Sequence, residues 1–409
     1  MRVAPLTLLL VYCAFVSLGL PDAVTGVAWP TMRSDFRLPV SYLGLALLGV
    51  GSGYAASGLA AGTLTRRLGI GGLLSISCLL VCVAMAGMAL SQDWRGLVTW
   101  PIVWGLGSGG IDAALNHYAA EHFPARHMNW LHACYSFGAA IGPLQMTFAI
   151  VWLGSWRLGY TLVAVAMAIM MAAFILTRRH WDDAATLASS NDLGVPDRGE
   201  RSADTTTHTP SIRTDVEGVA PISLSLRQAL SVGLVWWQAA TFFFYTGLEA
   251  LIGQWSTTLM TESRGTSAWA AGWWVGGYFL SIAIGRVLAG VMTERIGVAR
   301  WLGGSLWLVI LSTTLLQLPL GGTIGGITLV MLGIGLAPVF PCMMTQTPAR
   351  LGRELTRHAI GIQVAAATMG AVTIPSFVGV LIPELGMEVI AHAALLLAIA
   401  VMLLSKRFP

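Results

Sequence analysis

The chain has 409 residues, of which 56% are hydrophobic and 10% charged. An average soluble domain has about 25% charged residues, so this composition excludes an ordinary soluble protein. The formal net charge is +4, from 23 Lys and Arg against 19 Asp and Glu. These cations are spread over many loops and form no basic patch, so we expect no nucleic-acid partner.

Apolar stretches of roughly 20 residues recur along the chain, each long enough to cross a lipid bilayer. Lipid offers no hydrogen-bond partners to the backbone, so each stretch is predicted to be helical. We predict an all-α membrane protein with twelve transmembrane helices in two sets of six. The predicted spans are 6–30, 42–64, 71–91, 98–121, 130–153 and 158–177, then 228–258, 268–291, 301–319, 322–345, 359–382 and 388–405.

A polar segment separates the two sets. It contains Pro196, Pro210 and the run SADTTTHTP, and it has no hydrophobic periodicity. Such a composition cannot bury a core, so we predict a largely disordered linker with a short amphipathic piece at 224–230. The predicted units are an N-terminal bundle (1–177), a cytoplasmic linker (178–227) and a C-terminal bundle (228–409).

Arg and Lys are more frequent in the short loops on the side of the two termini, which predicts that both termini are cytoplasmic. We expect a monomer embedded in the plasma (inner) membrane. The five cysteines lie in apolar spans, where buried free thiols are expected rather than disulfides or metal ligands.

The two halves of the sequence repeat. GTLTRRLG at 62–69 is similar to GVMTERIG at 290–297, which lies 228 residues later. Gly19-Leu20 and Gly247-Leu248 have the same offset. A parallel repeat of six helices is typical of secondary transporters, with the solute site between the halves.

Four pairs of glycines at four-residue spacing are expected to allow close approach of helices, unless they serve ordinary packing. These pairs are Gly49/Gly53, Gly58/Gly62, Gly138/Gly142 and Gly272/Gly276.

Apart from the linker, the chain resembles the major facilitator superfamily. The loop at 62–69 is similar to that family's cytoplasmic loop motif, and the loop at 290–297 is its second copy. The resemblance implies a gating role for Gly62, Arg66, Arg67 and Gly69, and for Gly290, Glu294, Arg295 and Gly297. The family pattern has Asp at the fifth position, where this chain has Arg66, which leaves the ion pair of that Asp unaccounted for.

A narrower resemblance is to the fucose-permease-like branch of this family. GLGSGGIDAALN at 105–116 and NWLHACYSFGA at 129–139 are similar to patterns in its fourth and fifth helices, and Asp22 is similar to an Asp of its first helix. This resemblance implies proton-coupled uptake of a sugar-like solute. The wider family resemblance implies that spans 1, 4, 7 and 10 line the cavity.

Three carboxylic acids lie inside spans of that cavity set: Asp22, Asp112 and Glu249. A charged side chain at the centre of a bilayer costs about 2.5–3.5 kcal/mol on insertion scales, so such residues are usually functional. A carboxyl group removed from water can bind and release a proton near neutral pH. We predict that all three couple transport to protons. Asp112 is the first choice, because its counterpart in the repeat, Phe340, is not acidic.

Each acid also has a structural alternative. Asp112 could bond to the backbone or to hydroxyl groups of a neighbouring helix. Asp22 could cap a helix break beside Pro21. Glu249 could bond to Tyr245, one turn earlier on the same face.

Amide and aromatic side chains near these acids are predicted to bind the solute, because rings stack on apolar faces and amides bond to hydroxyl groups. The predicted solute-binding residues are Asn116, Gln238, Tyr245, Gln254 and Trp255. Arg286 is predicted to have a structural role, paired with a helix end or with Glu294. His117 and His132 are expected to be packing residues rather than proton relays.

GLGSGG at 105–110 fits G-x-G-x-x-G, but it lies inside a predicted span and follows no strand, so it is not a nucleotide loop. The sequence shows no Walker motif, catalytic constellation or metal-ligand spacing, so we expect no cofactor, no metal and no enzymatic activity. It favours a proton-coupled secondary transporter that imports a sugar or another small polar solute by alternating access. A proton-driven efflux antiporter for drugs or metabolites and a non-transporting membrane receptor remain open.

Overall fold

The computed structural model describes residues 5–123, 125–178, 181 and 226–405. The first half comprises α1 (Pro5–Gly19), α2 (Val24–Asp35), α3 (Tyr42–Leu90), α4 (Trp94–His122), α5 (Ala125–Val151) and α6 (Trp156–Leu176). The second half comprises α8 (Leu226–Ser231), α9 (Gly233–Thr258), the π-helix η1 (Leu259–Ser263), α10 (Ala268–Ile296), α11 (Val298–Leu315), α12 (Gly322–Leu336), α13 (Val339–Leu385) and α14 (Val389–Ser405). The all-α fold is as predicted.

The helices of the described ranges account for the twelve predicted spans. α1 and α2 form the first span, interrupted at residues 20–23. α3 and α13 each run through two spans, and each reverses at a glycine: Gly69 with φ of 72° and Gly352 with φ of 75°. These left-handed conformations favour glycine because it has no Cβ. The tenth span extends from α12 into the first part of α13.

Most of these spans are apolar enough to cross a membrane by length and composition alone. Eight helical stretches of the described chain meet that description, and one of them, α3, contains two spans. α14 is a shorter apolar helix. α4 and α9 are not among the eight, because polar side chains interrupt their apolar sequence. These two helices carry Asp112 and Glu249.

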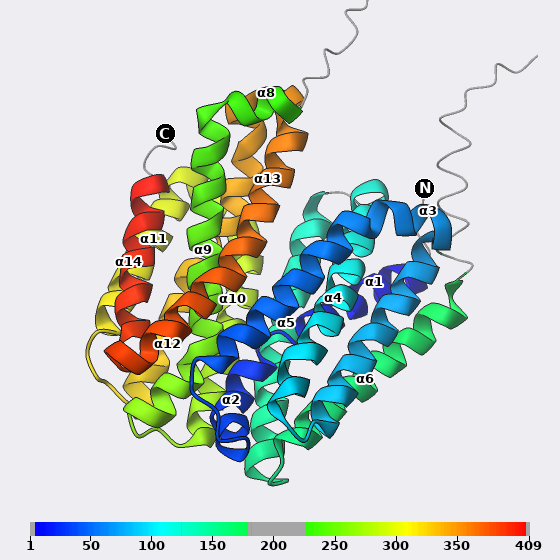
Figure 1. Cartoon of the computed structure of the whole chain (residues 1–409). Coiled ribbons are helices and arrows are strands. Elements are labelled where there is room, and N and C mark those ends of the chain that lie inside the picture. Colours follow the sequence, from blue (N-terminus) through cyan, green and yellow to red (C-terminus); the bar gives the residue numbers. More distant parts are fainter. Residues whose placement is uncertain (1–4, 124, 179–180, 182–225, 406–409) are drawn as a thin grey trace, which may run out of the picture.

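The two halves form two bundles that lie side by side (Figure 1). The repeat seen in the sequence reappears in how their helices pack. A Cβ on Gly138 of α5 would lie 2.0 Å from the carbonyl oxygen of Val16 in α1. A Cβ on Gly370 of α13 would lie 1.9 Å from the carbonyl oxygen of Phe243 in α9. The same close helix contact is therefore built from glycine in both halves.

Of the glycine pairs predicted to allow close approach, one does not. A Cβ on Gly58 or Gly62 would meet nothing within 4 Å, whereas the other three pairs lie against neighbouring helices. Gly58 and Gly62 therefore allow no close contact in this conformation.

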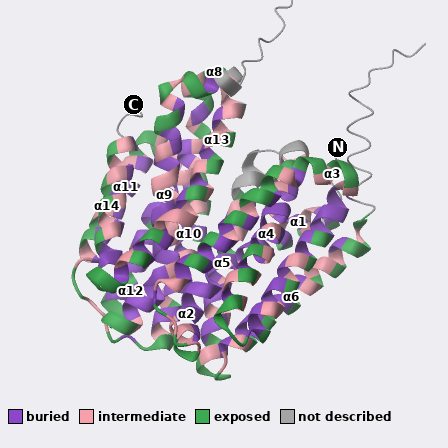
Figure 2. Cartoon of the chain, viewed as in Figure 1, coloured by how far each residue is buried: buried purple, intermediate pink, exposed green. Residues whose placement is uncertain are grey.

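Buried side chains fill the interior of each bundle, and exposed apolar side chains cover the outside (Figure 2). Leu59 is 89% exposed and Leu176 is 83% exposed. Apolar side chains on an outer surface are unfavourable in water but suit contact with lipid. The surface therefore agrees with a membrane-embedded chain.

The start of α1 and the end of α14 lie on one side of the molecule together with α8, and we call this the terminal side (Figure 1). The α2–α3 and α5–α6 connections and η1 lie on the other side, which we call the opposite side. The halves contact each other towards the opposite side, where Ser376 of α13 donates a hydrogen bond to the carbonyl of Gly44 in α3 at 3.0 Å.

The start of the predicted linker is corrected by the structure. Arg178 donates a hydrogen bond to the carbonyl of Leu68 at 3.2 Å. Trp181 is fully buried, packs against Tyr118 and Phe174, and therefore belongs to the N-terminal bundle. The rest of the linker, 182–225, lies outside the described residues, so its predicted disorder stays a prediction. The short piece predicted at 224–230 corresponds to α8.

Candidate functional site

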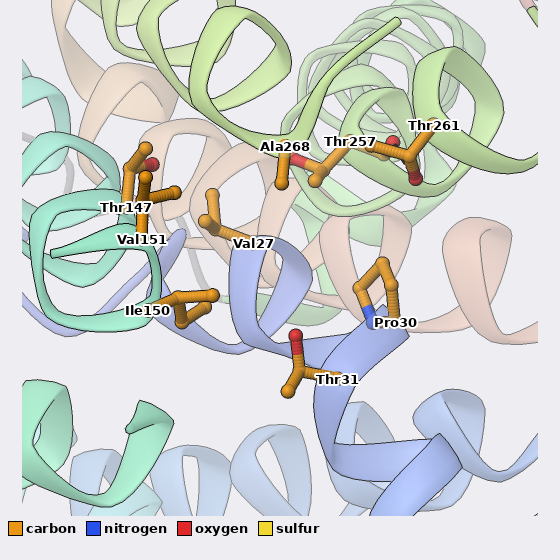
Figure 3. Close-up of a pocket in the computed structure, with 9 residues that line it drawn as sticks. All are labelled: Val27, Pro30, Thr31, Thr147, Ile150, Val151, Thr257, Thr261 and Ala268. Carbon is orange, nitrogen blue, oxygen red and sulfur yellow. Dashed lines mark hydrogen bonds between the residues drawn. The ribbon is translucent and has the colours of Figure 1, made fainter. Parts of the chain in front are cut away.

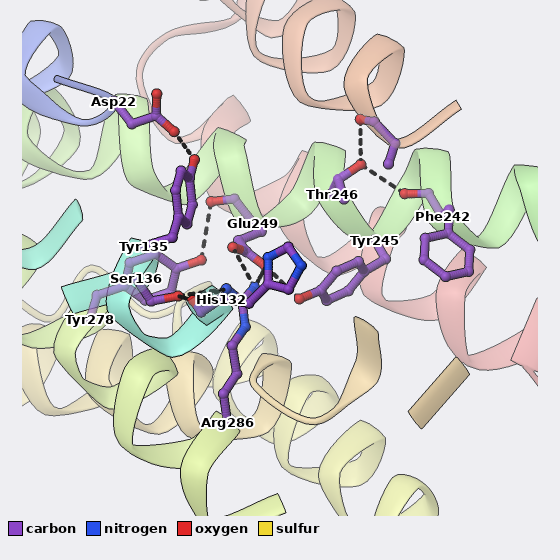
Figure 4. Close-up of polar contacts among 11 residues, drawn as sticks. Asp22, His132, Tyr135, Ser136, Phe242, Tyr245, Thr246, Glu249, Tyr278 and Arg286 are labelled. Atoms are coloured by element: carbon purple, nitrogen blue, oxygen red, sulfur yellow. Dashed lines mark hydrogen bonds and ion pairs between the residues drawn. The ribbon is translucent and has the colours of Figure 1, made fainter. Parts of the chain in front are cut away.

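Asp22 lies at the interruption between α1 and α2, near the middle of the first span. Its carboxylate accepts a hydrogen bond from the Tyr135 hydroxyl of α5 (Figure 4). The alternative that Asp22 caps the break is not what the structure shows, because the N-terminus of α2 has no side-chain cap. The interruption thus directs a carboxyl group towards α5.

Glu249 of α9 is held by several partners (Figure 4). Tyr245, one turn earlier, donates a hydrogen bond to its carboxylate. Arg286 of α10 lies 3.2 and 3.4 Å from its two carboxylate oxygens. Tyr278 of α10 donates to its backbone carbonyl at 3.1 Å. The predicted alternative, a bond between Tyr245 and Glu249, is present together with an ion pair that was not predicted.

The predicted pairing of Arg286 with Glu294 or a helix end is wrong. Its guanidinium binds Glu249 and also reaches α5, where it donates to the Ser136 hydroxyl at 2.5 Å and the His132 carbonyl at 3.5 Å. Both side chains of the ion pair are largely buried, with 11% of Arg286 and 17% of Glu249 exposed.

Asp112 and Asn116 of α4 bind each other. The Asn116 amide donates to the Asp112 carboxylate at 2.8 Å and to its backbone carbonyl at 3.0 Å. The Tyr54 hydroxyl of α3 lies close to this carboxylate. The carboxyl groups of Asp112 and Glu249 both lie close enough to that of Asp22 for their charges to interact. The three acids therefore form one group, as their positions on the predicted cavity helices suggested.

Gln254 joins this group from the second half. Its amide donates to the backbone carbonyl of Asp22 at 2.7 Å, so it links α9 to the break in the first span. Its amide oxygen is buried without a hydrogen-bond partner. An unpaired buried acceptor is costly, so this oxygen is a candidate for a solute hydroxyl group.

Two predicted solute-binding residues lie elsewhere. Gln238 is buried and accepts a hydrogen bond from Gln363 of α13 at 2.6 Å. Trp255 is fully buried and donates its indole N–H to the carbonyl of Pro375 at 2.9 Å. Both side chains hold α9 against α13. They are packing residues in this conformation, and the structure does not bring them to the acids.

Aromatic rings lie next to the acidic group. Phe340 of α13 packs against Phe242 with ring centroids 5.1 Å apart, and against Tyr245 at 6.4 Å. The His132 ring lies between Phe15 at 5.8 Å and Phe340 at 6.2 Å. This surrounding agrees with the expectation that His132 is a packing residue.

A pocket of about 130 Å³ lies between the halves on the opposite side (Figure 3). Its lining is apolar apart from threonine side chains, and it contains none of the predicted site residues: Val27, Pro30, Thr31, Thr147, Ile150, Val151, Thr257, Thr261 and Ala268. The pocket is separate from the acids.

The two copies of the loop motif lie on the terminal side. Gly69 and Gly297 have φ of 72° and 84°, so the repeat-related glycines end their helices in the same way. The Arg66 guanidinium bonds to Thr63 of its own helix at 3.3 Å. The gating role of all eight motif residues stays a prediction: Gly62, Arg66, Arg67, Gly69, Gly290, Glu294, Arg295 and Gly297.

The hydroxyl partners of the acids were not singled out from the sequence. Tyr135 and Ser136 lie within the stretch NWLHACYSFGA, whose resemblance to a helix pattern was the available signal. Tyr54 had no signal, because a tyrosine in a glycine-rich apolar span also fits ordinary packing.

Comparison with known proteins places this geometry in a family. Residues 11–258 and 239–408 match the model of the Major Facilitator Superfamily. The chain belongs to the major facilitator superfamily. The family expected from the loop motif and the repeat is therefore confirmed, and the protein is a membrane transporter rather than an enzyme.

The chain is also similar to two known transporters. The chain is 19% identical over 383 residues to the glucose/mannose transporter GlcP of Bacillus subtilis (strain 168), a match that spans 91% of this chain and 87% of that protein. It also matches the crystal structure of a bacterial homologue of the human lysosomal transporter Spinster, solved in an inward-facing and unoccupied conformation. That match has a TM-score of 0.70 at 14% identity, over 98% of this chain and 95% of that chain, and it supports the fold alone.

Proposed function

We propose that this transporter couples the movement of a sugar or another small polar solute to protons by alternating access. The observation that carries the proposal is the pair of acids Asp22 and Asp112 beside Gln254, whose amide links the second half to the backbone of Asp22. The partners described for Asp22 and Asp112 are hydroxyl and amide groups, which carry no charge. Protons can therefore neutralise these two acids without breaking an ion pair.

The solute class is supported by the polar atoms near the acids. The amide of Gln254 and the hydroxyl groups of Tyr135 and Tyr54 can exchange hydrogen bonds with sugar hydroxyl groups, and aromatic rings nearby can stack on a sugar ring. One relative is the glucose/mannose transporter GlcP, whose solutes belong to this class. We propose import across a plasma (inner) membrane, with both termini cytoplasmic and a monomer as the working unit.

The test is uptake of radiolabelled D-glucose into proteoliposomes. We expect accumulation above equilibrium when the lumen is alkaline relative to the outside, and simple equilibration with a sodium gradient or no gradient. Asp112→Asn should equilibrate glucose but lose accumulation. Asp93→Asn is the matched control, because Asp93 caps the N-terminus of α4 by accepting backbone N–H bonds and asparagine also caps helices well.

Several outcomes would reject the proposal. Accumulation that follows sodium alone would exclude proton coupling, and full accumulation by Asp112→Asn would exclude that residue from it. Glucose flux no greater than that of protein-free liposomes, together with proton-driven movement of a cationic drug, would favour an efflux antiporter. A protein that moves none of these probes under any gradient would favour a receptor.

A further inference from the structure

Arg286 is a largely buried cation beside the acids, and its guanidinium holds groups from both halves (Figure 4). One terminal nitrogen faces the Glu249 carboxylate at 3.2 and 3.4 Å. The other donates to the Ser136 hydroxyl at 2.5 Å. Arginine stays protonated, and its planar fork of donors can hold two partners in fixed directions. One side chain thus connects a carboxylate of its own half to a helix of the other half.

The packing of α5 against α10 makes this reach possible. A Cβ on Gly272 would lie 1.7 Å from the Thr147 hydroxyl, and one on Gly276 would lie 2.6 Å from a Leu144 methyl group. Absence of side chains at these glycines lets the two helices approach closely. Arg286 lies ten residues beyond Gly276 on the same helix. The contact with α5 is therefore part of a packed interface.

Glu249 differs from the other two acids in having a charged partner, whereas the described partners of Asp22 and Asp112 are neutral. A proton that arrives at Asp22 or Asp112 removes a charge whose described partners are neutral. A proton that arrives at Glu249 would leave the buried Arg286 without its counter-charge. Breaking one side of a buried ion pair is strongly unfavourable, whereas removing both partners together is often tolerated.

We propose that Arg286 is a positioning residue that ties Glu249 to α5 through Ser136, so that Glu249 is a fixed counter-charge and not a proton carrier. The assignment of Asp22 and Asp112 as the proton carriers rests on the proposed function. The contact of Arg286 with Glu249 and Ser136 does not depend on that function. The proposal reduces the number of proton carriers from the three acids of the sequence-based prediction to two.

The tie also locates a bond that changes during transport. Glu249 and Arg286 belong to the same half and stay together when the halves move. Ser136 belongs to the other half, so alternating access breaks or remakes its bond to Arg286. The ionisable groups around Glu249 are Tyr245 of α9, Tyr278 and Arg286 of α10, and Asp22 and His132 from the first half.

The ion pair is tested by a double-mutant cycle on thermal unfolding in detergent, at one fixed scan rate because membrane proteins often unfold irreversibly. Glu249→Gln and Arg286→Met each leave one buried group without its partner. The double variant removes both. We expect it to unfold at a higher temperature than either single variant. A double variant whose Tm falls by the sum of the two single shifts would overturn the ion pair as a unit.

The link between the halves is tested by a second cycle. Ser136→Ala should lower the Tm of the wild type more than that of Arg286→Met, because the second background has already lost the bond to Arg286 and keeps only the bond from the Ser136 hydroxyl to the His132 carbonyl at 3.1 Å. Ser75→Ala is the matched control, since the Ser75 hydroxyl bonds to the Gly71 carbonyl within α3. Its effect should be equal in both backgrounds. Additive effects of Ser136→Ala and Arg286→Met would overturn the tie.

The proton assignment is tested by glucose transport in proteoliposomes. The double variant Glu249→Gln/Arg286→Met should still accumulate glucose when a pH gradient is imposed, whereas Asp22→Asn should only equilibrate it. Loss of accumulation by the double variant, with its glucose exchange intact, would overturn the assignment. If the wild type itself shows no proton-driven accumulation, the proposed function fails, and the two stability cycles still decide the role of Arg286.

Discussion

Arg33 of α2 and Glu262 of η1 form a two-point ion pair that joins the halves on the opposite side. The Arg33 Nε lies 2.9 Å from one carboxylate oxygen, and a terminal nitrogen bonds to the other. Glu262 belongs to a π-helical turn, a form that is rare and often found at functional sites. The side chains are 29% and 21% exposed, so solvent weakens the pair but does not remove it.

We expect Glu262→Gln to shift the conformational equilibrium towards states that are open on the opposite side. Ion pairs this exposed contribute about 0.2–1 kcal/mol, which corresponds to a change of up to about fivefold in the ratio of states. Distance measurements between spin labels at Gln92 and Glu384, one in each half, would report the change. Asp35→Asn is the control, because the pair between Asp35 and Arg157 lies within one half. An unchanged distance distribution would contradict the prediction.

We expect Tyr135→Phe to change the pH profile of solute uptake, because it removes the hydroxyl group that bonds to Asp22 and keeps the ring. Tyr160→Phe is the matched control: that hydroxyl bonds to Thr25 at 3.0 Å within the same half. Both variants should lose about 1 kcal/mol of stability. Only the first should alter the pH profile, and equal profiles in uptake assays from pH 5 to about 8 would refute this role of Tyr135.

The ion pair between Glu388 and Arg264 predicts how stability depends on pH. Burial acts to raise the pKa of Glu388, which lies between α13 and α14. Hydrogen bonds from Arg264 and Ser263 outweigh burial and lower the pKa below its ordinary value. A lowered folded-state pKa adds stability that is fully present above the unfolded-state value, about 4.3, and lost as the pH falls through the folded-state value.

Glu388→Gln removes this contribution. We therefore expect the variant to unfold at a lower temperature than the wild type at pH 7, and the difference in Tm to shrink as the pH falls below about 4. Glu384→Gln, an exposed acid on the same side, is the control and should show no such convergence. A difference in Tm that is constant from pH 7 to pH 3 would argue against the ion pair as its source.

Gly138→Ala should destabilise the first bundle. Its new methyl group would lie 2.0 Å from a backbone carbonyl of α1, so the two helices must move apart. Overpacking of this kind costs about 1–3 kcal/mol. Gly58→Ala is the control, because a Cβ there meets nothing within 4 Å. Thermal unfolding of both variants checks the expectation, and an equal Tm for the two would disprove it.

Much of the fold could be predicted from patterns that are visible directly in the sequence. The length of the apolar stretches predicts spans because a bilayer has a fixed thickness. The offset between 62–69 and 290–297 predicts two equivalent halves, and Gly69 and Gly297 do adopt the same left-handed conformation. The linker boundary was wrong because Trp181, although it lies in a polar stretch, finds an apolar site on the first bundle.

The site was only partly predictable, because the decisive contacts join helices that are far apart in the sequence. The three acids were found since a charge in an apolar span stands out. The partner of Arg286 was wrong because Glu294 lies nearby in sequence, whereas Glu249 lies nearby in space. Trp255 was assigned to the solute because its sequence position does not reveal which side of α9 faces α13.

Tyr135 and Ser136 are consecutive residues, and they bind charged groups that belong to different halves of the protein. Successive side chains leave an α-helix about 100° apart, so the register of α5 sets both bonds at once. Insertion or deletion of one residue between Ala125 and Cys134 would rotate the start of α5 relative to this pair. An insertion or deletion in the helical turn that contains Tyr135 and Ser136 would misalign both of their contacts together. Length variation in α5 should therefore be far less tolerated than in the α5–α6 connection, where a Cβ on Gly154 would meet nothing within 4 Å.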